Sequence, residues 1–110
     1  MSGLGTTICR GNVATSLLIG PILTPVAVLG AITAEQSFTV SGLALNDMVD
    51  AASNVAQTAG IGIANVRVSA INTLTIAFSN STAGTLTPVA GQYLICIVRA
   101  ESLPLPTAAV

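Results

Sequence analysis

The sequence predicts an all-β fold, an antiparallel β-sandwich that is jelly-roll-like, with an immunoglobulin-like sandwich as the alternative. Three observations predict it. The apolar residues recur with a period of two rather than 3.6 along most of the chain, as strands require. Threonine, valine and isoleucine dominate these periodic segments, which suits a pleated surface. Turn signals rich in glycine, proline and asparagine separate roughly six to eight short strands, a spacing typical of sandwiches.

The first half of the chain predicts four strands, and glycine or proline stands between several of them. They are expected at residues 15–19, 22–29, 35–42 and 47–52. In the third of these, Phe38 and Val40 are expected to face inward, because they alternate with polar residues. Residues 46–58 leave a minor alternative open, since their apolar residues also fit one or two helical turns.

The second half of the chain predicts a hairpin and a final strand. Residues 61–70 and 73–80 alternate strictly and are joined by a tight connection at Ile71 and Asn72. One face of the first strand is expected to carry Ile61, Ile63, Asn65, Arg67 and Ser69. The final strand, residues 92–99, is apolar on both faces, so it should lie centrally in a sheet or face a partner on its second side.

A chain of 110 residues supports one domain. We expect residues 14–100 to form the β-sandwich domain, residues 1–13 an extended N-terminal arm, and residues 101–110 a proline-containing C-terminal tail. Ends of this kind are held in place most simply by a neighbouring subunit. The residues of the two ends that we expect to bind a partner are Leu4, Ile8, Arg10, Leu103 and Leu105.

The chain has only 3 basic and 4 acidic side chains, and it contains no histidine. A soluble domain normally carries about a quarter charged residues, so this surface predicts self-association or burial in a lattice. The net charge of −1 and the scarcity of aromatic residues exclude a nucleic-acid partner. Residues 11–34 are uncharged, but their glycine and proline residues argue against a membrane span.

No residue pattern predicts catalysis, a cofactor or a metal site. Without histidine, the commonest general base and metal ligand is missing. Cys9 and Cys96 are far apart in the sequence, and we expect free thiols, with Cys96 packed within its strand. Asp47 and Asp50 lack the companion oxygen ligands of a calcium loop and are expected to be solvated turn residues. We therefore expect a non-enzymatic protein.

Arg67 and Arg99 are the candidate binding residues within the predicted domain. Each could lie on the solvent face and pair with Glu35 or Glu101, which adds at most about 1 kcal/mol when exposed. Each could instead form an ion pair with another subunit, because the planar guanidinium group is favoured at interfaces. The sequence leaves both alternatives open.

Several runs of the chain carry a resemblance to a known family. They are residues 34–43, Asp47, residues 60–70, residues 72–74, residues 78–82 and the pair Thr87-Pro88. This pattern, which covers about residues 33–99, resembles the small structural proteins encoded beside the capsid genes of tailed bacteriophages. The ends, residues 1–32 and 100–110, carry no such resemblance.

The resemblance implies a capsid cement or decoration subunit with a jelly-roll or related sandwich fold. Such a subunit would be made in the host cytoplasm, sit on the outer capsid surface of the virion and stabilise contacts between major capsid proteins. Its partners would be the major capsid protein and itself, as a dimer or trimer. The alternatives are a phage tail or fibre subunit and a receptor-binding or carbohydrate-binding structural subunit.

Overall fold

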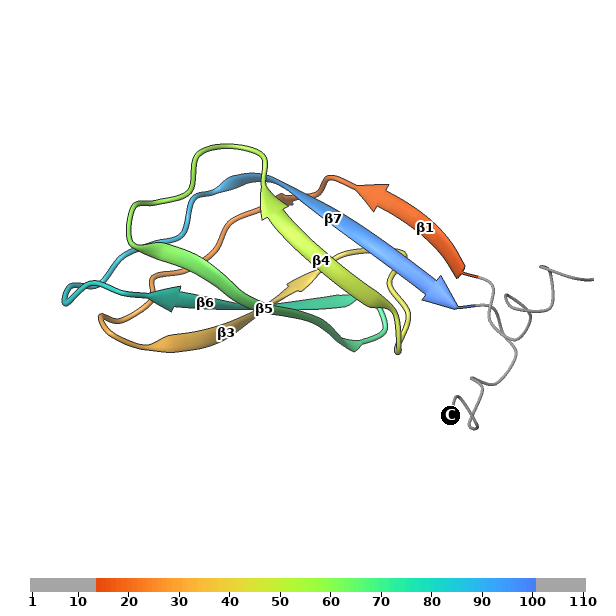
Figure 1. Cartoon of the computed structure of the whole chain (residues 1–110), viewed down its shortest axis with the longest axis horizontal. Helices are drawn as coiled ribbons and strands as arrows, with labels where there is room; N and C mark the ends of the chain where they lie inside the picture. The colour runs from red at the N-terminus through yellow and green to blue at the C-terminus, as the bar shows by residue number, and fades with distance from the viewer. Residues whose placement is uncertain (1–13, 101–110) are drawn as a thin grey trace, which may run out of the picture.

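The computed structural model describes residues 14–100, which form two antiparallel β-sheets packed face to face (Figure 1). This confirms the predicted all-β sandwich. The predicted arm and tail lie outside the described residues. The strands are β1 (Ala14–Ile19), β2 (Ile22–Leu23), β3 (Thr33–Thr39), β4 (Met48–Ser53), β5 (Ile61–Ala70), β6 (Thr73–Asn80) and β7 (Gly91–Ala100).

The first sheet is built around β7. One edge of β7 pairs with β1 and then, further along, with the short β2, while the other edge pairs with β4. The side chains of Tyr93, Ile95 and Ile97 point into the sandwich and are buried. Of the two alternatives that the sequence left open for this doubly apolar strand, the central position is present, and the partner on its second side stays a prediction.

The second sheet has the order β3-β6-β5. Its central strand, β6, contributes the buried side chains of Leu74, Ile76 and Phe78 to the core. The β5–β6 hairpin predicted from the sequence is present, and Asn72 at its tip adopts a positive φ of 58°, which asparagine tolerates better than most residues.

The core lies between the two sheets. The rings of Phe78 and Tyr93 meet edge to face, with centroids 6.4 Å apart. The hydroxyl of Tyr93 donates a hydrogen bond to the Val89 carbonyl at 2.7 Å and accepts one from Gln57 at 3.1 Å, so its polar end is satisfied inside the domain. The core consists of Leu23, Val28, Val40, Leu43, Ile61, Leu74, Ile76, Phe78, Tyr93, Ile95 and Ile97.

The chain crosses between the two sheets repeatedly, from β2 to β3, from β3 to β4, from β4 to β5 and from β6 to β7. Jelly rolls also alternate in this way, but they contain eight strands. Because β1 and β2 share one edge of β7, the described residues fill only three strand positions in each sheet. The jelly-roll arrangement therefore stays a prediction, whereas the sandwich is established.

The strand expected at residues 22–29 is much shorter than predicted. Only Ile22 and Leu23 pair with β7, and further on Val28 forms an isolated bridge with Leu86. Pro25 has no N–H group to donate to a ladder, and the backbone of Val26 is hydrogen-bonded to the side chain of Gln36 instead. Proline and this side-chain contact together end the strand.

The strict alternation predicted for residues 61–70 is wrong beyond Ile63. A β-bulge at Ala64 shifts the register, so that Ile63 lies opposite Phe78 but Asn65 lies opposite Ala77. After the bulge, Val66 and Val68 pack against the core, and Arg67 points outward. A bulge adds one residue to one strand and thereby exchanges the two faces that follow it.

The helical alternative for residues 46–58 is also wrong. Met48–Ser53 pairs with β7 along its whole length as strand β4, and a loop follows. Residues 14–100 contain no helix that is long and apolar enough to cross a membrane.

Candidate functional site

The outer face of the β3-β6-β5 sheet is covered by polar side chains that bond to one another. Thr75, at the centre of β6, lies within hydrogen-bond distance of Ser37 on β3 at 2.9 Å and of Ser69 on β5 at 2.8 Å. Arg67 donates two hydrogen bonds of 2.9 Å to Glu35, from β5 across to β3. Glu35 lies directly opposite Ala77, so the ion pair spans the central strand at that point, and Ala77 is buried. This face is complete without a partner.

A second ion pair closes one end of the sandwich. Arg99 follows the buried Ile95 and Ile97 on the same face of β7, so it belongs to the inner face of the sheet. Its guanidinium group donates to both carboxylate oxygens of Asp47, at 2.8 and 2.7 Å, and to the carbonyl of Gly42 at 2.7 Å. The side chain of Asp47 is only 2% exposed, so the expectation of a solvated turn residue is wrong for it.

The ion pairs change the pKa values of their members. The hydrogen bonds from Arg67 hold the pKa of the Glu35 carboxyl below its ordinary value, although partial desolvation opposes the shift. The hydrogen bonds from Arg99, aided by the Ala44 N–H group, likewise lower the pKa of Asp47. Both arginines have a raised pKa because they donate to these carboxylates. All four groups are therefore charged at neutral pH.

The outer face of the β1-β7-β4 sheet has the opposite character. We call it the apolar face, and it is made of Ser16, Leu18, Met48, Asp50, Ala52, Leu94, Cys96 and Val98. Leu18 is 68% exposed and Met48 is 71% exposed. Its one carboxylate, Asp50, bonds to the N–H group of the adjacent Ala51 and has no ion-pair partner in the described residues.

Cys96 lies in the middle of the apolar face. It is a free thiol, as predicted, but it is exposed rather than packed. The register places it between Leu18 on β1 and Asp50 on β4. The expectation of a packed side chain is wrong because β7 has neighbouring strands on both edges, whereas only one face of its sheet is covered by the second sheet. Cys96 lies on the other face.

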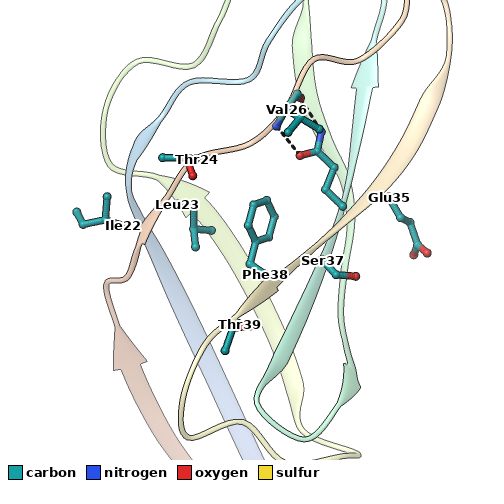
Figure 2. A pocket seen from close by; sticks show the side chains of 9 residues that line it. Ile22, Leu23, Thr24, Val26, Glu35, Ser37, Phe38 and Thr39 are labelled. Atoms are coloured by element: carbon teal, nitrogen blue, oxygen red, sulfur yellow. Dashed lines mark hydrogen bonds between the residues drawn. The ribbon is translucent and has the colours of Figure 1, made fainter.

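A groove of about 570 Å³ runs between β3 and the segment that contains β2 (Figure 2). In Figure 2 the ring of Phe38 points into it, toward Leu23. At one end, the Gln36 amide exchanges two hydrogen bonds of 2.8 Å with the backbone of Val26. Glu35 is the only charged residue of the lining, and both of its oxygens already accept from Arg67. The groove thus has a mixed polar and apolar lining and offers no acid–base pair.

The predicted binding residues have different outcomes. Leu4, Ile8, Arg10, Leu103 and Leu105 lie outside the described residues. Arg67 pairs with Glu35 within the chain, one of the two partners named for it. Arg99 pairs with Asp47, which was not among the partners named for it. The structure does not bring Arg67 and Arg99 together, since they lie on different sheets.

The sequence pattern of β7 indicated the apolar face, but two of the exposed residues of that face, Leu18 and Met48, were not predicted. The doubly apolar pattern of β7 was recognised as a strand that needs either a central position or a partner. Leu18 and Met48 were not singled out, because their exposure depends on which face of an edge strand they occupy. Their register with Cys96 and Val98 was the missing information.

The described residues contain no cluster of three or more histidine, cysteine or acidic residues that could hold a metal ion. Comparison of the chain with protein-family models, with curated proteins and with solved structures finds no match. The functional argument therefore rests on the surfaces of the chain itself.

Proposed function

We propose that this chain is a non-enzymatic virion structural protein. In this proposal it is a capsid cement or decoration subunit of a tailed bacteriophage, located on the capsid surface. It binds the outer shell as a homo-oligomer, a dimer or a trimer, and stabilises contacts between major capsid proteins. The observation that carries the proposal is the apolar face, a sheet surface that the described residues leave uncovered.

The size of the apolar face suits a subunit that acts in many copies. Three strands about 4.8 Å apart and six residues long, at about 3.3 Å each, give a surface of roughly 15 × 20 Å. A stable binary interface buries about 800 Å² per partner, so a single face of this size binds weakly. Many weakly bound copies on a regular shell are nevertheless retained strongly.

The charge distribution also supports the proposal. Of the charged side chains in residues 16–99, Glu35, Arg67, Asp47 and Arg99 neutralise one another in pairs. Asp50 on the apolar face is the exception, and it offers a partner one ionic contact within an apolar surface. Interfaces commonly combine an apolar centre with a few oriented polar contacts.

The alternative of a carbohydrate-binding subunit gains no support from the aromatic residues. Such proteins present exposed rings to the sugar, but Phe78 and Tyr93 are fully buried here. Phe38, the third aromatic side chain, is half-buried in the groove. No observation in residues 14–100 favours the tail, fibre or receptor-binding alternatives over capsid cementing.

The test is binding of the purified chain to shells of the parent phage from which this chain has been removed. We expect saturable rebinding and a restored resistance of the shell to heat and osmotic shock. Met48→Lys places a charge in the apolar face and is expected to weaken rebinding at least tenfold. Ile71→Lys is the matched control, because Ile71 is a similarly exposed apolar residue at the tip of the β5–β6 hairpin, away from that face.

Two results would count against the proposal. Shells that lack the chain and yet keep their full thermal and osmotic resistance would exclude a cementing role. Equal rebinding of Met48→Lys and the unmodified chain would exclude the apolar face as the surface that contacts the shell. Weakened rebinding of Ile71→Lys alone would move the contact to the hairpin tip.

A further inference from the structure

The free edge of β1 differs from the sheet edges at β3, β4 and β5. β1 (Ala14–Ile19) contains no charged residue and no proline, and its pairing with β7 runs without a bulge. In Figure 1, β1 extends past the ends of β3, β5 and β6. Consistent with this, Leu17 is 43% exposed although it lies on the inner face of the sheet, opposite the buried Ile97.

The other edges carry the features by which proteins prevent edge-to-edge pairing. β5 has two register irregularities and the charged Arg67, while β4 carries Asp50. β3 carries the charged Glu35, and the side chain of its Gln36 bonds to the backbone of Val26. Charges, bulges and covering contacts are the usual protections of a sheet edge. β1 is the unprotected edge of the described domain.

We propose that β1 is a dimerisation edge, at which a second copy of this chain pairs antiparallel with β1 to form one continuous sheet across a two-fold axis. The inference deepens the proposed function, on which its biological role rests, by naming the surface that makes the homo-oligomer. It concerns the edge of the sheet and not the apolar face that we assign to the shell.

The hydrogen-bond pattern sets the register of this pairing. The Tyr93 N–H group donates to the Pro21 carbonyl at 2.9 Å, and Pro21 and Tyr93 continue the β1–β7 register. Bonded residues alternate along an antiparallel pair, so Leu17 also bonds to β7, whereas Ser16 and Leu18 direct their N–H and C=O groups to the free edge.

A two-fold axis at Leu17 satisfies these groups. Ser16 of each copy then exchanges backbone hydrogen bonds with Leu18 of the other, and the two Leu17 side chains meet across the axis. A second copy fits better than an unrelated partner, because an edge without charges offers nothing to select a different chain and identical edges meet without like-charge repulsion.

An edge of six residues is only about 20 Å long, which alone is too little surface for a stable dimer. We therefore expect a weak dimer in solution, which is reinforced where many copies are held side by side on the shell.

Disulfide trapping tests the register. In a background of Cys9→Ser and Cys96→Ser, Leu17→Cys should form a dimer under mild oxidation, because the two Cα atoms of a non-hydrogen-bonded pair lie about 4.5 Å apart. Leu18→Cys is the matched control, since its two Cα atoms would lie about 8 Å apart, beyond disulfide range. We expect at least tenfold more trapped dimer for Leu17→Cys than for Leu18→Cys in solution, and we expect the Leu17→Cys dimer to be trapped on shells as well.

A second variant keeps the test valid if Leu17→Cys disturbs folding. Leu18→Pro removes an N–H group that faces the free edge and leaves the hydrogen bonds to β7 intact. Sedimentation should show a concentration-dependent dimer for the unmodified chain and a monomer for Leu18→Pro. Equal trapping of both cysteine variants, or an unmodified chain that is monomeric in solution and untrapped on shells, overturns the inference.

The outcomes also separate this inference from the proposed function. A chain that rebinds stripped shells but never pairs through β1 leaves the cementing proposal standing and overturns the dimerisation edge. A chain that is trapped at Leu17 but binds no shell supports the edge and argues against cementing.

Discussion

The two sheets of the sandwich differ in how completely they are satisfied within one chain. On the β3-β6-β5 sheet, the outward side chains of Ser37, Ser69 and Thr75 bond to one another, and an ion pair spans the central strand. On the β1-β7-β4 sheet, the outward Leu18 and Met48 contact mainly solvent. Only the outer face of the β3-β6-β5 sheet is adapted to water.

This difference shows that the few charged residues of the domain are not spread evenly over its surface. Four of the charges form two ion pairs. The Arg99–Asp47 pair closes one end of the sandwich, and the Arg67–Glu35 pair lies on the outer face of the β3-β6-β5 sheet. The remaining outer face and the edge of β1 are left apolar or unpaired. Replacing the bonded polar side chains of the β3-β6-β5 sheet should therefore reduce the stability of the domain, whereas introducing polar side chains on the apolar face should not.

The largest loss of stability is expected for Asn80→Ala at the end of β6. The buried Asn80 side chain donates to the carbonyls of Val28 and Gly84 and accepts two hydrogen bonds from Thr82, at 2.7 to 3.0 Å. Its removal leaves buried polar groups unpaired, which should lower the free energy of unfolding by about 3 kcal/mol. Chemical denaturation of the variant measures this loss.

Asn54→Ala is the control for that variant. Asn54 is exposed, and its side chain makes one hydrogen bond, to Gln92 at 2.8 Å. We expect a change within about 0.5 kcal/mol. Similar losses for both variants would show that the buried network at Asn80 contributes no more than a surface contact.

Much of this organisation could be predicted from the sequence. The alternation of residues 35–42 and the tight turn at Asn72 indicated β3, which runs from Thr33 to Thr39, and the β5–β6 hairpin, because local period and turn chemistry determine both. The double apolarity of residues 92–99 indicated the central strand and its uncovered side. These signals are local, and a single sequence displays them directly.

The remaining features depend on contacts between distant residues. The bulge at Ala64 has no local signature among small and apolar neighbours, so the outward face of β5 was assigned wrongly beyond it. Asp47 was expected in solvent because its partner, Arg99, lies 52 residues away. The exposure of Leu18 and Met48 likewise depends on pairing with β7, which periodicity does not reveal.

Acid should destabilise the domain through the two carboxylates of the ion pairs. The pKa values of Glu35 and Asp47 are lower in the folded chain than their ordinary values of about 4. The unfolded chain therefore takes up protons first as the pH falls. The stabilisation is complete above about pH 5 and is lost as the pH drops through the folded pKa values.

Denaturation midpoints measured between pH 7 and pH 2 test this dependence. Asp47→Asn removes the more buried carboxylate and should flatten the acid limb of the curve, while Glu35→Gln should flatten it less, because its side chain is 45% exposed. A curve for Asp47→Asn that parallels the unmodified chain would contradict the role of this ion pair.

A smaller effect is expected for Thr75→Val at the centre of β6. Valine keeps the shape of threonine but cannot bond to Ser37 or Ser69, whose hydroxyls can turn to water instead. We expect a loss of about 1 kcal/mol in the free energy of unfolding. Thr33→Val, at the exposed start of β3, should change it by less than about 0.5 kcal/mol. Equal values would mean that the hydroxyl contacts do not stabilise this face.

The smallest effect on stability, and the sharpest contrast between the sheets, is expected for Met48→Lys. Met48 is 71% exposed, so a charged side chain there displaces no packing, and unfolding should change by less than about 0.5 kcal/mol. Val49→Lys, one residue further along β4, points toward the core and should cost about 2 kcal/mol. Chemical denaturation of the pair compares the two sides of one strand. A large loss for Met48→Lys would mean that its side of β4 is already packed within the single chain, which would leave no apolar face to offer a shell.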